Sequence, residues 1–222
     1  MSNRTEVIPE DILVGRIEKS EAAANIDYYQ RHAERFFQET ISVDMRPLYQ
    51  PFLPLLPAGG RILDAGCGSG RDLRAFRELG FQTTGFDASS SLVALASEHL
   101  GEPVHCLNFR DIPWHDEFHG IWACASLLHI PRSDLAYILK RLAKALISSG
   151  ILYASFKYGT TEREKDGRFF TDMDESTLAA LLDEVAVFAP LDIWITADQR
   201  PGRDDERWLN ALLRKVDNPA QD

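Results

Sequence analysis

The segment RILDAGCGSGRD, residues 61–72, constrains the fold of this chain more than any other stretch. It passes from apolar, strand-like residues into a turn with glycine at 66, 68 and 70, and then into a polar helix start. Glycine permits positive φ and leaves room for a ligand against bare backbone. In open parallel sheets, ligands sit at the carboxyl ends of the strands, and the first strand-to-helix turn is the usual contact. The segment therefore predicts a strand, a ligand-binding loop and a helix.

Strand-like and helical patterns alternate along the rest of the chain. QTTGFDAS precedes SSLVALASEHLG, PVHCLNF follows, GIWACAS precedes SDLAYILKRLAKAL, and GILYASFKYG precedes DESTLAALLDEV, where Asp174 or Ser176 can cap the helix. Such alternation predicts βαβ units around a parallel sheet whose strands are apolar on both faces. LDIWITAD and ERWLNALLRKV flank the turn-forming residues QRPGRDD and predict a final antiparallel hairpin.

Composition and charge limit the possible functions. With 222 residues, 45% of them hydrophobic, the chain fits one α/β domain, and no apolar run reaches the roughly 18 residues of a membrane span. We see no signal peptide and expect a cytoplasmic protein, either a monomer or a homodimer, with no membrane partner. A net charge of −10 disfavours nucleic acid as a partner. Three cysteines without a close pair predict reduced thiols and no metal site.

The glycine spacing and the nearby acids indicate which ligand the loop binds. A dinucleotide fingerprint would place its third glycine at position 71, where this chain has Arg71. Asp87 ends a strand about twenty residues past the loop, where a carboxylate can accept hydrogen bonds from ribose hydroxyls. Asp64 and Asp72 flank the turn. A nucleoside that carries a sulfonium and an ammonium fits these acids better than a pyrophosphate does.

The order D-A-G-C-G-S-G, G-F-D-A-S, N-F-R-D-I-P-W and A-S-L-L-H resembles class I S-adenosylmethionine-dependent methyltransferases, and most of all small bacterial methyltransferases of the tellurite-resistance-like type. The resemblance covers residues 28–216. It implies an α/β, Rossmann-like methyltransferase fold: a mostly parallel seven-stranded sheet with an antiparallel terminal hairpin and helices on both faces. It also implies an N-terminal tail over 1–20 and a single domain over 21–217, which includes an N-terminal lid helix over 21–40.

The resemblance further implies how S-adenosylmethionine, and its product S-adenosylhomocysteine, would be bound. Asp64 and Gly66 would hold the methionine part, Cys67 and Gly68 would contact it through backbone, and Asp87 would bind the ribose. Asn108 and Phe109 would flank the adenine, and Ala123 and Cys124 would lie near the sulfur. The remaining expected cofactor contacts are Tyr28, Ala65, Arg71 and Ala88.

The acceptor is expected to be a small molecule bound next to the cofactor. His129 follows the fourth strand and is the candidate general base; packing or helix capping is an equally weighted alternative. Lys157 and Arg168 could bind an anionic acceptor and Tyr158 could wall the pocket, although a solvated charged loop would explain all three. Two other functions stay open at this point: cofactor binding without catalysis, and a nicotinamide-dependent oxidoreductase, which the displaced third glycine disfavours.

Overall fold

The computed structural model describes residues 23–216, so the tail expected over 1–20 lies outside the described residues. The helices are α2 (Ala33–Thr40), α3 (Arg46–Phe52), α4 (Arg71–Glu78), α5 (Ser90–Leu100), α6 (Arg132–Ala145) and α7 (Glu175–Val185), with short 3-10 turns η1 (Leu53–Leu55), η2 (Phe109–Asp111) and η3 (Leu127–His129). The strands are β1 (Arg61–Ala65), β2 (Gln82–Asp87), β3 (His105–Cys106), β4 (Phe118–Ala123), β5 (Leu146–Lys157), β6 (Glu162–Lys165), β7 (Arg168–Thr171), β8 (Phe188–Ala197) and β9 (Arg207–Lys215).

Seven strands form one sheet in the order β3-β2-β1-β4-β5-β9-β8. The strands β1 to β5 are parallel to one another, whereas β9 runs antiparallel between β5 and β8. The predicted parallel sheet with an antiparallel terminal hairpin is confirmed. The order reverses at β1, and so the loop that follows β1 lies at the switch point where such sheets bind ligands.

Apolar side chains pack on both faces of the sheet, as expected for central parallel strands. On one face α6 and α7 cover alternate residues such as Leu63, Ile121 and Leu152. On the other face α3 and α4 cover the residues between them, among which Trp122 and Tyr153 stack with ring centroids 3.8 Å apart. This stacked pair lies directly beneath the start of α4.

The N-terminal segment is helical but is not one continuous helix. Residues 23–31 form a first helical stretch, a turn follows at His32, and α2 continues to Thr40. The lid helix expected over 21–40 is therefore broken at His32, whose φ of −114° leaves the helical range.

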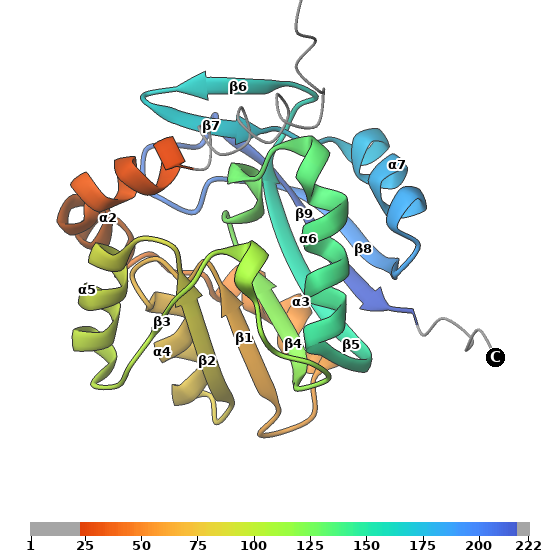
Figure 1. Ribbon diagram of the computed structural model, residues 1–222, viewed down its shortest axis with the longest axis horizontal. Helices are drawn as coiled ribbons and strands as arrows, with labels where there is room; N and C mark the ends of the chain where they lie inside the picture. The colour runs from red at the N-terminus through yellow and green to blue at the C-terminus, as the bar shows by residue number, and fades with distance from the viewer. Residues whose placement is uncertain (1–22, 217–222) are drawn as a thin grey trace, which may run out of the picture.

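Residues 162–171 form a separate two-stranded hairpin, β6–β7, which the sequence analysis did not predict. Figure 1 shows this hairpin standing above the upper edge of the main sheet, with α2 at the other end of the same edge. At the opposite edge, α6 passes directly into β5 at Leu146, which pairs with Phe118 at the start of β4. The hairpin therefore adds structured chain around the ligand-binding edge.

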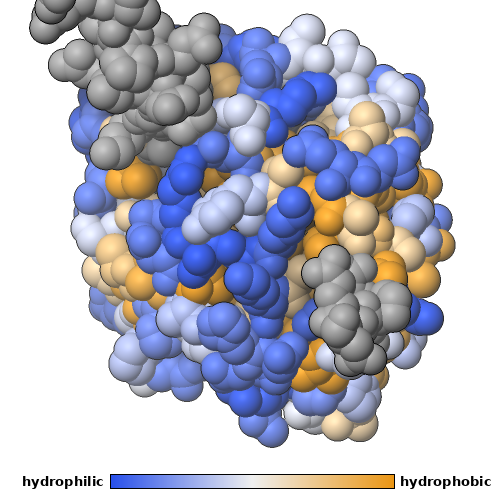
Figure 2. All heavy atoms as spheres, turned by 45° about the vertical axis from the view of Figure 1, so that its right-hand side comes forward, coloured by the Kyte–Doolittle hydropathy of each residue, from blue (hydrophilic) through white to orange (hydrophobic). Residues whose placement is uncertain are grey.

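Both edges of the seven-stranded sheet are interrupted. β3 has only two residues, and the pairing of β8 with β9 shifts register between Pro190 and Asp192. On the face seen in Figure 2, hydrophilic side chains predominate, with smaller apolar patches between them. Across residues 23–216, no helix combines the length and the apolar character that crossing a membrane requires.

Candidate active site

The loop after β1 is shaped by glycines with positive φ, 79° at Gly66 and 52° at Gly68. The N–H groups of Gly66 and Cys67 both donate to the carbonyl of Phe86 at the end of β2, each at 2.9 Å. A Cβ at Gly66 would lie 2.6 Å from the Cβ of Ser126, which follows β4. Glycine is therefore needed for the loop to sit between the ends of β2 and β4.

Asp87 is held with both carboxylate oxygens fixed. Its Oδ2 accepts from the N–H of Gly68 and its Oδ1 from the N–H of Ser89, both at 2.9 Å. Burial raises the pKa of Asp87, and these backbone donors oppose the rise. Each oxygen retains a second lone pair, which is the arrangement that a pair of vicinal ribose hydroxyls requires.

Asp64 is buried at the end of β1 and is 2% exposed. Its Oδ2 has no hydrogen-bond partner, which is rare for a buried carboxylate oxygen. Burial and the nearby charge of Asp72 raise the pKa of Asp64 well above its ordinary value. An unpartnered buried acceptor at this position fits a ligand that brings a cation, such as an ammonium group.

The second flanking acid, Asp72, lines the cavity but is already paired within the protein. Its carboxylate accepts from the Tyr49 hydroxyl, from Trp122 Nε1 at 2.8 Å and from two nitrogens of Arg71 at 2.7 and 2.9 Å. Burial alone would raise the pKa of Asp72, but Arg71 and the two other donors hold it below its ordinary value. Asp72 therefore joins α4 to the aromatic core, and its charge is balanced by Arg71, which leaves Asp64 as the acid expected to pair with a cation.

The expected adenine contacts are Asn108, which caps η2, and Phe109, the first residue of η2. Asn108 accepts the N–H of Arg110 through Oδ1 at 2.7 Å, and the ring of Phe109 packs edge-on against Phe86 with centroids 5.1 Å apart. Ala88 follows Asp87 and lines the same cavity. These residues form a continuous wall from the ribose acid to η2.

A single cavity of about 1280 Å³ extends along the carboxyl edge of the sheet. Most expected cofactor residues line it: Tyr28, Gly66, Cys67, Gly68, Arg71, Asp87, Ala88, Asn108, Phe109 and Cys124. Single small-molecule sites usually occupy about 300 to 1,000 Å³, so this cavity has room for two ligands side by side. Asp64, Ala65 and Ala123 are not among the lining residues, because all three are buried within the sheet next to it.

The two thiols in the cavity wall are free and unreactive. Cys67 and Cys124 form no disulfide, and Cys106 is also free. Burial raises the pKa of the Cys124 thiol to about 12 and raises that of Cys67 as well. Since the thiolate is the nucleophile and the metal ligand, these side chains act as small wall residues.

His129 lies at the end of η3 and lines the cavity. Its Nδ1 lies 2.9 Å from the carbonyl of Phe169, and its Nε2 lies 2.8 Å from the hydroxyl of Tyr29. A carbonyl can only accept, so Nδ1 carries the proton and Nε2 accepts from Tyr29. Burial lowers the pKa of His129 to about 4, which keeps the ring neutral. The candidate base therefore reaches the cavity through the Tyr29 hydroxyl.

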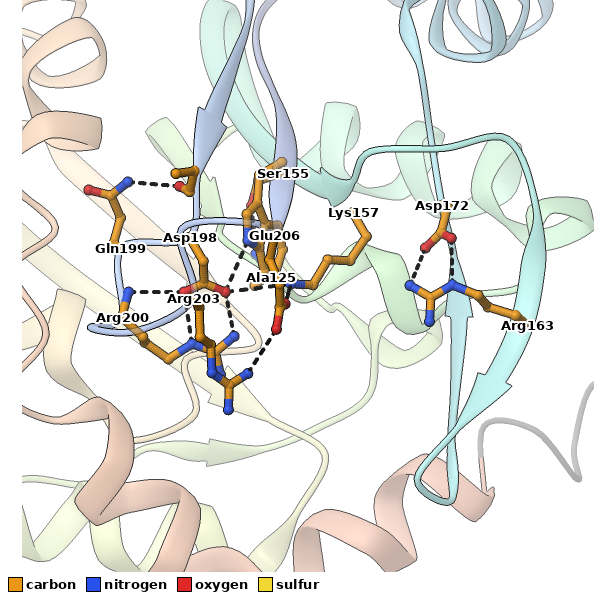
Figure 3. A network of polar contacts seen from close by, with 12 residues as sticks. Ala125, Ser155, Lys157, Arg163, Asp172, Asp198, Gln199, Arg200, Arg203 and Glu206 are labelled. Atoms are coloured by element: carbon orange, nitrogen blue, oxygen red, sulfur yellow. Dashed lines mark hydrogen bonds and ion pairs between the residues drawn. The ribbon is translucent and has the colours of Figure 1, made fainter.

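Of the three expected acceptor residues, Lys157 and Tyr158 are occupied by other contacts. Lys157 is paired with Asp198 and Glu206 and lies over the ring of Trp208 (Figure 3). Tyr158 is 40% exposed and donates to Glu175 at the cavity rim. The Lys157 network fixes the loop between β8 and β9, so its charge is neutralised within the protein.

Arg168, the third expected acceptor residue, lies in the cavity wall on β7. Its guanidinium lies over the ring of Tyr28 at 4.7 Å and over the ring of Phe170 at 5.2 Å. Its Nε is buried and has no hydrogen-bond partner among residues 23–216. No carboxylate in that range pairs with Arg168, whose guanidinium interacts with the Tyr29 side chain and leaves a positive charge in the cavity wall.

Sequence reasoning missed the residues that fasten the N-terminal segment across the cavity. The amide of Asn25 pairs with both the N–H and the carbonyl of Phe169, at 2.8 and 3.3 Å. Gln30 Oε1 accepts from the N–H and the hydroxyl of Ser91, both at 3.0 Å. The segment thus joins the β6–β7 hairpin to the start of α5, and no local sequence pattern marks Asn25 or Gln30 for these contacts.

Ala125, which follows β4, adopts a strained conformation beside the site. Its φ is 53°, and its N–H donates to Ser155 Oγ at 2.8 Å (Figure 3). Non-glycine residues in this region cost of order 1 to 3 kcal/mol and persist where surrounding contacts fix them. The strain lies at the cavity wall, where such backbone is most often found.

Comparisons with known proteins agree with this geometry. Residues 62–150 match the family described as "Methyltransferase domain". The chain is 34% identical over 103 residues to the ubiquinone biosynthesis O-methyltransferase of Nitrobacter winogradskyi, covering 44% of this chain but only 39% of that relative. It is 28% identical over 167 residues to YqeM of Bacillus subtilis, named as a proposed methyltransferase, covering 68% of this chain and 66% of YqeM.

Among solved structures, the fold is similar to that of Burkholderia thailandensis 1,6-didemethyltoxoflavin-N1-methyltransferase, described with its namesake compound and S-adenosylhomocysteine bound. The TM-score is 0.74 at 22% identity, covering 97% of this chain and 94% of that one. The matched segment and the shared fold agree with each other. Residues 62–150 belong to the methyltransferase domain family, and the chain as a whole has the fold of the Burkholderia methyltransferase.

Proposed function

We propose that this protein transfers a methyl group from S-adenosylmethionine to a small-molecule acceptor by direct in-line displacement. The observation that supports this most strongly is the buried, unpartnered Oδ2 of Asp64 beside the glycine loop. It supplies an acceptor for the ammonium group of the methionine part, while Asp87 supplies the two ribose acceptors. S-adenosylmethionine brings a methyl group that the positive sulfur activates toward nucleophiles.

The residues of this chain contribute alignment and exclusion of water. The N-terminal segment covers the carboxyl edge through Asn25 and Gln30 and separates the cavity from solvent on that side. Methyl transfer to an oriented acceptor needs no covalent nucleophile, because holding reactants in line supplies much of the rate. The high thiol pKa of Cys124 agrees with a mechanism that uses no cysteine.

The relatives favour a small acceptor over a macromolecule. The Nitrobacter relative is named as an O-methyltransferase of ubiquinone biosynthesis and the Burkholderia relative as an N1-methyltransferase of 1,6-didemethyltoxoflavin. The net charge of −10 also disfavours a nucleic-acid acceptor. The cavity volume beyond that of one ligand provides space for such an acceptor next to the cofactor.

The proposal is tested by calorimetric titration with S-adenosylmethionine, S-adenosylhomocysteine and NADH. We expect saturable binding of the first two and none of NADH, followed by release of S-adenosylhomocysteine when acceptors are screened. Binding of NADH in their place would refute the assignment. Binding of S-adenosylmethionine with no methyl transfer to any compound of a broad small-molecule panel would favour the second candidate, a binding protein without catalysis.

A further inference from the structure

The cavity wall carries a cluster of which only Tyr28 is also an expected cofactor contact. Its members are Tyr28, Tyr29, His129, Arg168 and Phe170, which come from the N-terminal segment, η3 and β7. We propose that this cluster binds a planar, acidic acceptor, whose anion pairs with Arg168 and whose proton passes to the Tyr29–His129 pair. This inference rests on the proposed function and names the acceptor class and a further catalytic residue, Tyr29.

The chemistry of Arg168 selects an anion. Its buried Nε lacks a partner, although buried guanidinium nitrogens normally have one. The carboxylates of Asp172 and Asp198, also in this region, already pair with Arg163 and Arg200. No carboxylate among residues 23–216 pairs with Arg168, so an anionic ligand in the cavity can pair with its guanidinium.

The rings around Arg168 select a flat molecule. Tyr28 and Phe170 both lie against the guanidinium, and Tyr29 meets Tyr28 edge-on with ring centroids 5.4 Å apart. Aromatic faces and edges of this kind bind planar rings in offset or edge-to-face geometry. An aromatic hydroxyl, an enol or an acidic ring N–H satisfies both the flat wall and the cation.

The path of the proton follows from the hydrogen bonds already present. Tyr29 donates to Nε2 of His129, and Nδ1–H of His129 donates to the Phe169 carbonyl. The acceptor's O–H or N–H bond breaks, its proton goes to the Tyr29 oxygen, and the Tyr29 hydroxyl proton goes to Nε2. The acceptor's electron pair then forms the bond to the methyl carbon, and sulfur keeps the pair of the broken carbon–sulfur bond.

The geometry of the cluster is fixed by one backbone segment. Phe169 is held through its N–H and carbonyl by Asn25, and the same carbonyl accepts from His129. The next residue toward the hairpin turn is Arg168, and the segment of Asn25 also carries Tyr29. A change that moves Phe169 therefore also moves Arg168, the Tyr29–His129 pair and the N-terminal segment.

The test uses phenols whose anions absorb visible light, so that binding of the anion can be detected without knowing the natural acceptor. 4-Nitrophenol and 2-nitrophenol absorb visible light as anions, and their methyl ethers, 4-nitroanisole and 2-nitroanisole, are neutral analogues. Protein saturated with S-adenosylhomocysteine is titrated with each probe at a pH that lies below the pKa of both probes and above that of His129. We expect at least one phenol to bind at least tenfold more tightly than its ether and to gain anion absorbance on binding.

Arg168→Met should weaken phenol binding by about 10- to 100-fold, the effect of losing a charged hydrogen bond, and should leave S-adenosylhomocysteine binding unchanged. Arg203→Met, another cavity-lining arginine that pairs with Glu206, is the matched control and should change neither. If Arg168→Met weakens S-adenosylhomocysteine binding instead, Arg168 belongs to the cofactor site and the inference is wrong.

The role of Tyr29 is read separately, by nitrogen NMR of the His129 ring. When the phenol binds, Nε2 should become protonated in the wild type and stay unprotonated in Tyr29→Phe, which keeps the ring but lacks the hydroxyl. Tyr137→Phe, an exposed tyrosine on α6, is the control. Anion binding with Nε2 unchanged in the wild type would overturn the relay.

The two proposals fail in different ways. Absence of S-adenosylhomocysteine binding to the wild type would refute the proposed function. Normal S-adenosylhomocysteine binding with no preference of any probe over its ether would refute only the acceptor assignment.

Discussion

The buried Arg71–Asp72 pair offers a quantitative test of how the glycine loop is anchored. Asp72 accepts four hydrogen bonds, two from Arg71 and one each from Tyr49 and Trp122, and the two charged side chains are 18% and 7% exposed. Asp72→Asn keeps the volume but removes the charge. The guanidinium is then left buried without its counter-charge, which costs about 3 to 5 kcal/mol of unfolding free energy.

The assay is equilibrium urea unfolding of the protein without ligand, carried out in two backgrounds. In the Arg71→Met background no buried cation remains, so Asp72→Asn should cost at least about 1.5 kcal/mol less than it does in the wild type. Glu117→Gln, which breaks the half-exposed pair with Arg61, is the control and should cost less than about 1 kcal/mol. If Asp72→Asn lowers the unfolding free energy equally in both backgrounds, pairing with Arg71 is not the main contribution of the Asp72 charge to stability.

Three further outcomes follow from the titratable groups of the site. Asp87→Ala should weaken S-adenosylmethionine binding by about 1 to 3 kcal/mol, since buried ribose hydroxyls lose their acceptors; unchanged affinity in calorimetry would show that the ribose binds elsewhere. Asp64→Asn should raise the melting temperature at pH 7, because burial raises the pKa of Asp64 and its ionisation opposes folding, yet should weaken S-adenosylmethionine binding; a lower melting temperature would contradict this. Burial lowers the pKa of His129 to about 4, from an ordinary value of about 6.5, so the unfolding free energy should fall as the pH drops through this range. His129→Gln should remove that part of the fall in urea titrations. An identical pH dependence in the variant would argue against a buried neutral ring.

Much of the fold could be predicted because its signals are local. Central strands such as β1 and β4 are apolar on both faces, and Asp174 caps α7 through the N–H of Thr177 as expected. The final hairpin followed from the turn residues between β8 and β9. These features depend on neighbouring residues, which a single sequence displays directly.

The β6–β7 hairpin was missed although its turn is visible in the sequence. Asp166 and Gly167 have φ of 53° and 74°, the pair of positive values that a two-residue hairpin turn requires. The flanking residues 162–165 are all charged, so no apolar alternation marked a strand. Only the Asp-Gly pair indicated a hairpin, and the charged residues around it favoured a loop instead.

The candidate site was predicted better for the cofactor than for the acceptor. Asp87 and Gly68 lie on one loop system whose spacing is fixed by the strand–loop–helix unit. Tyr29 meets His129 across 100 residues of sequence, and no local pattern can indicate that contact. The free or paired state of Lys157 likewise depends on Glu206, in a loop whose position only the folded sheet determines.

The interrupted sheet edges bear on how copies of this protein behave at high concentration. An edge strand presents unpaired N–H and C=O groups that can recruit another chain, and short strands, proline and bulges reduce this. β3 offers only two residues, and on β8 Pro190 has no N–H to donate beside the register shift. Backbone geometry thus limits lateral growth of the sheet at β3 and around Pro190, whereas residues 192–197 of β8 pair regularly with β9 and form the longest regular stretch of sheet edge.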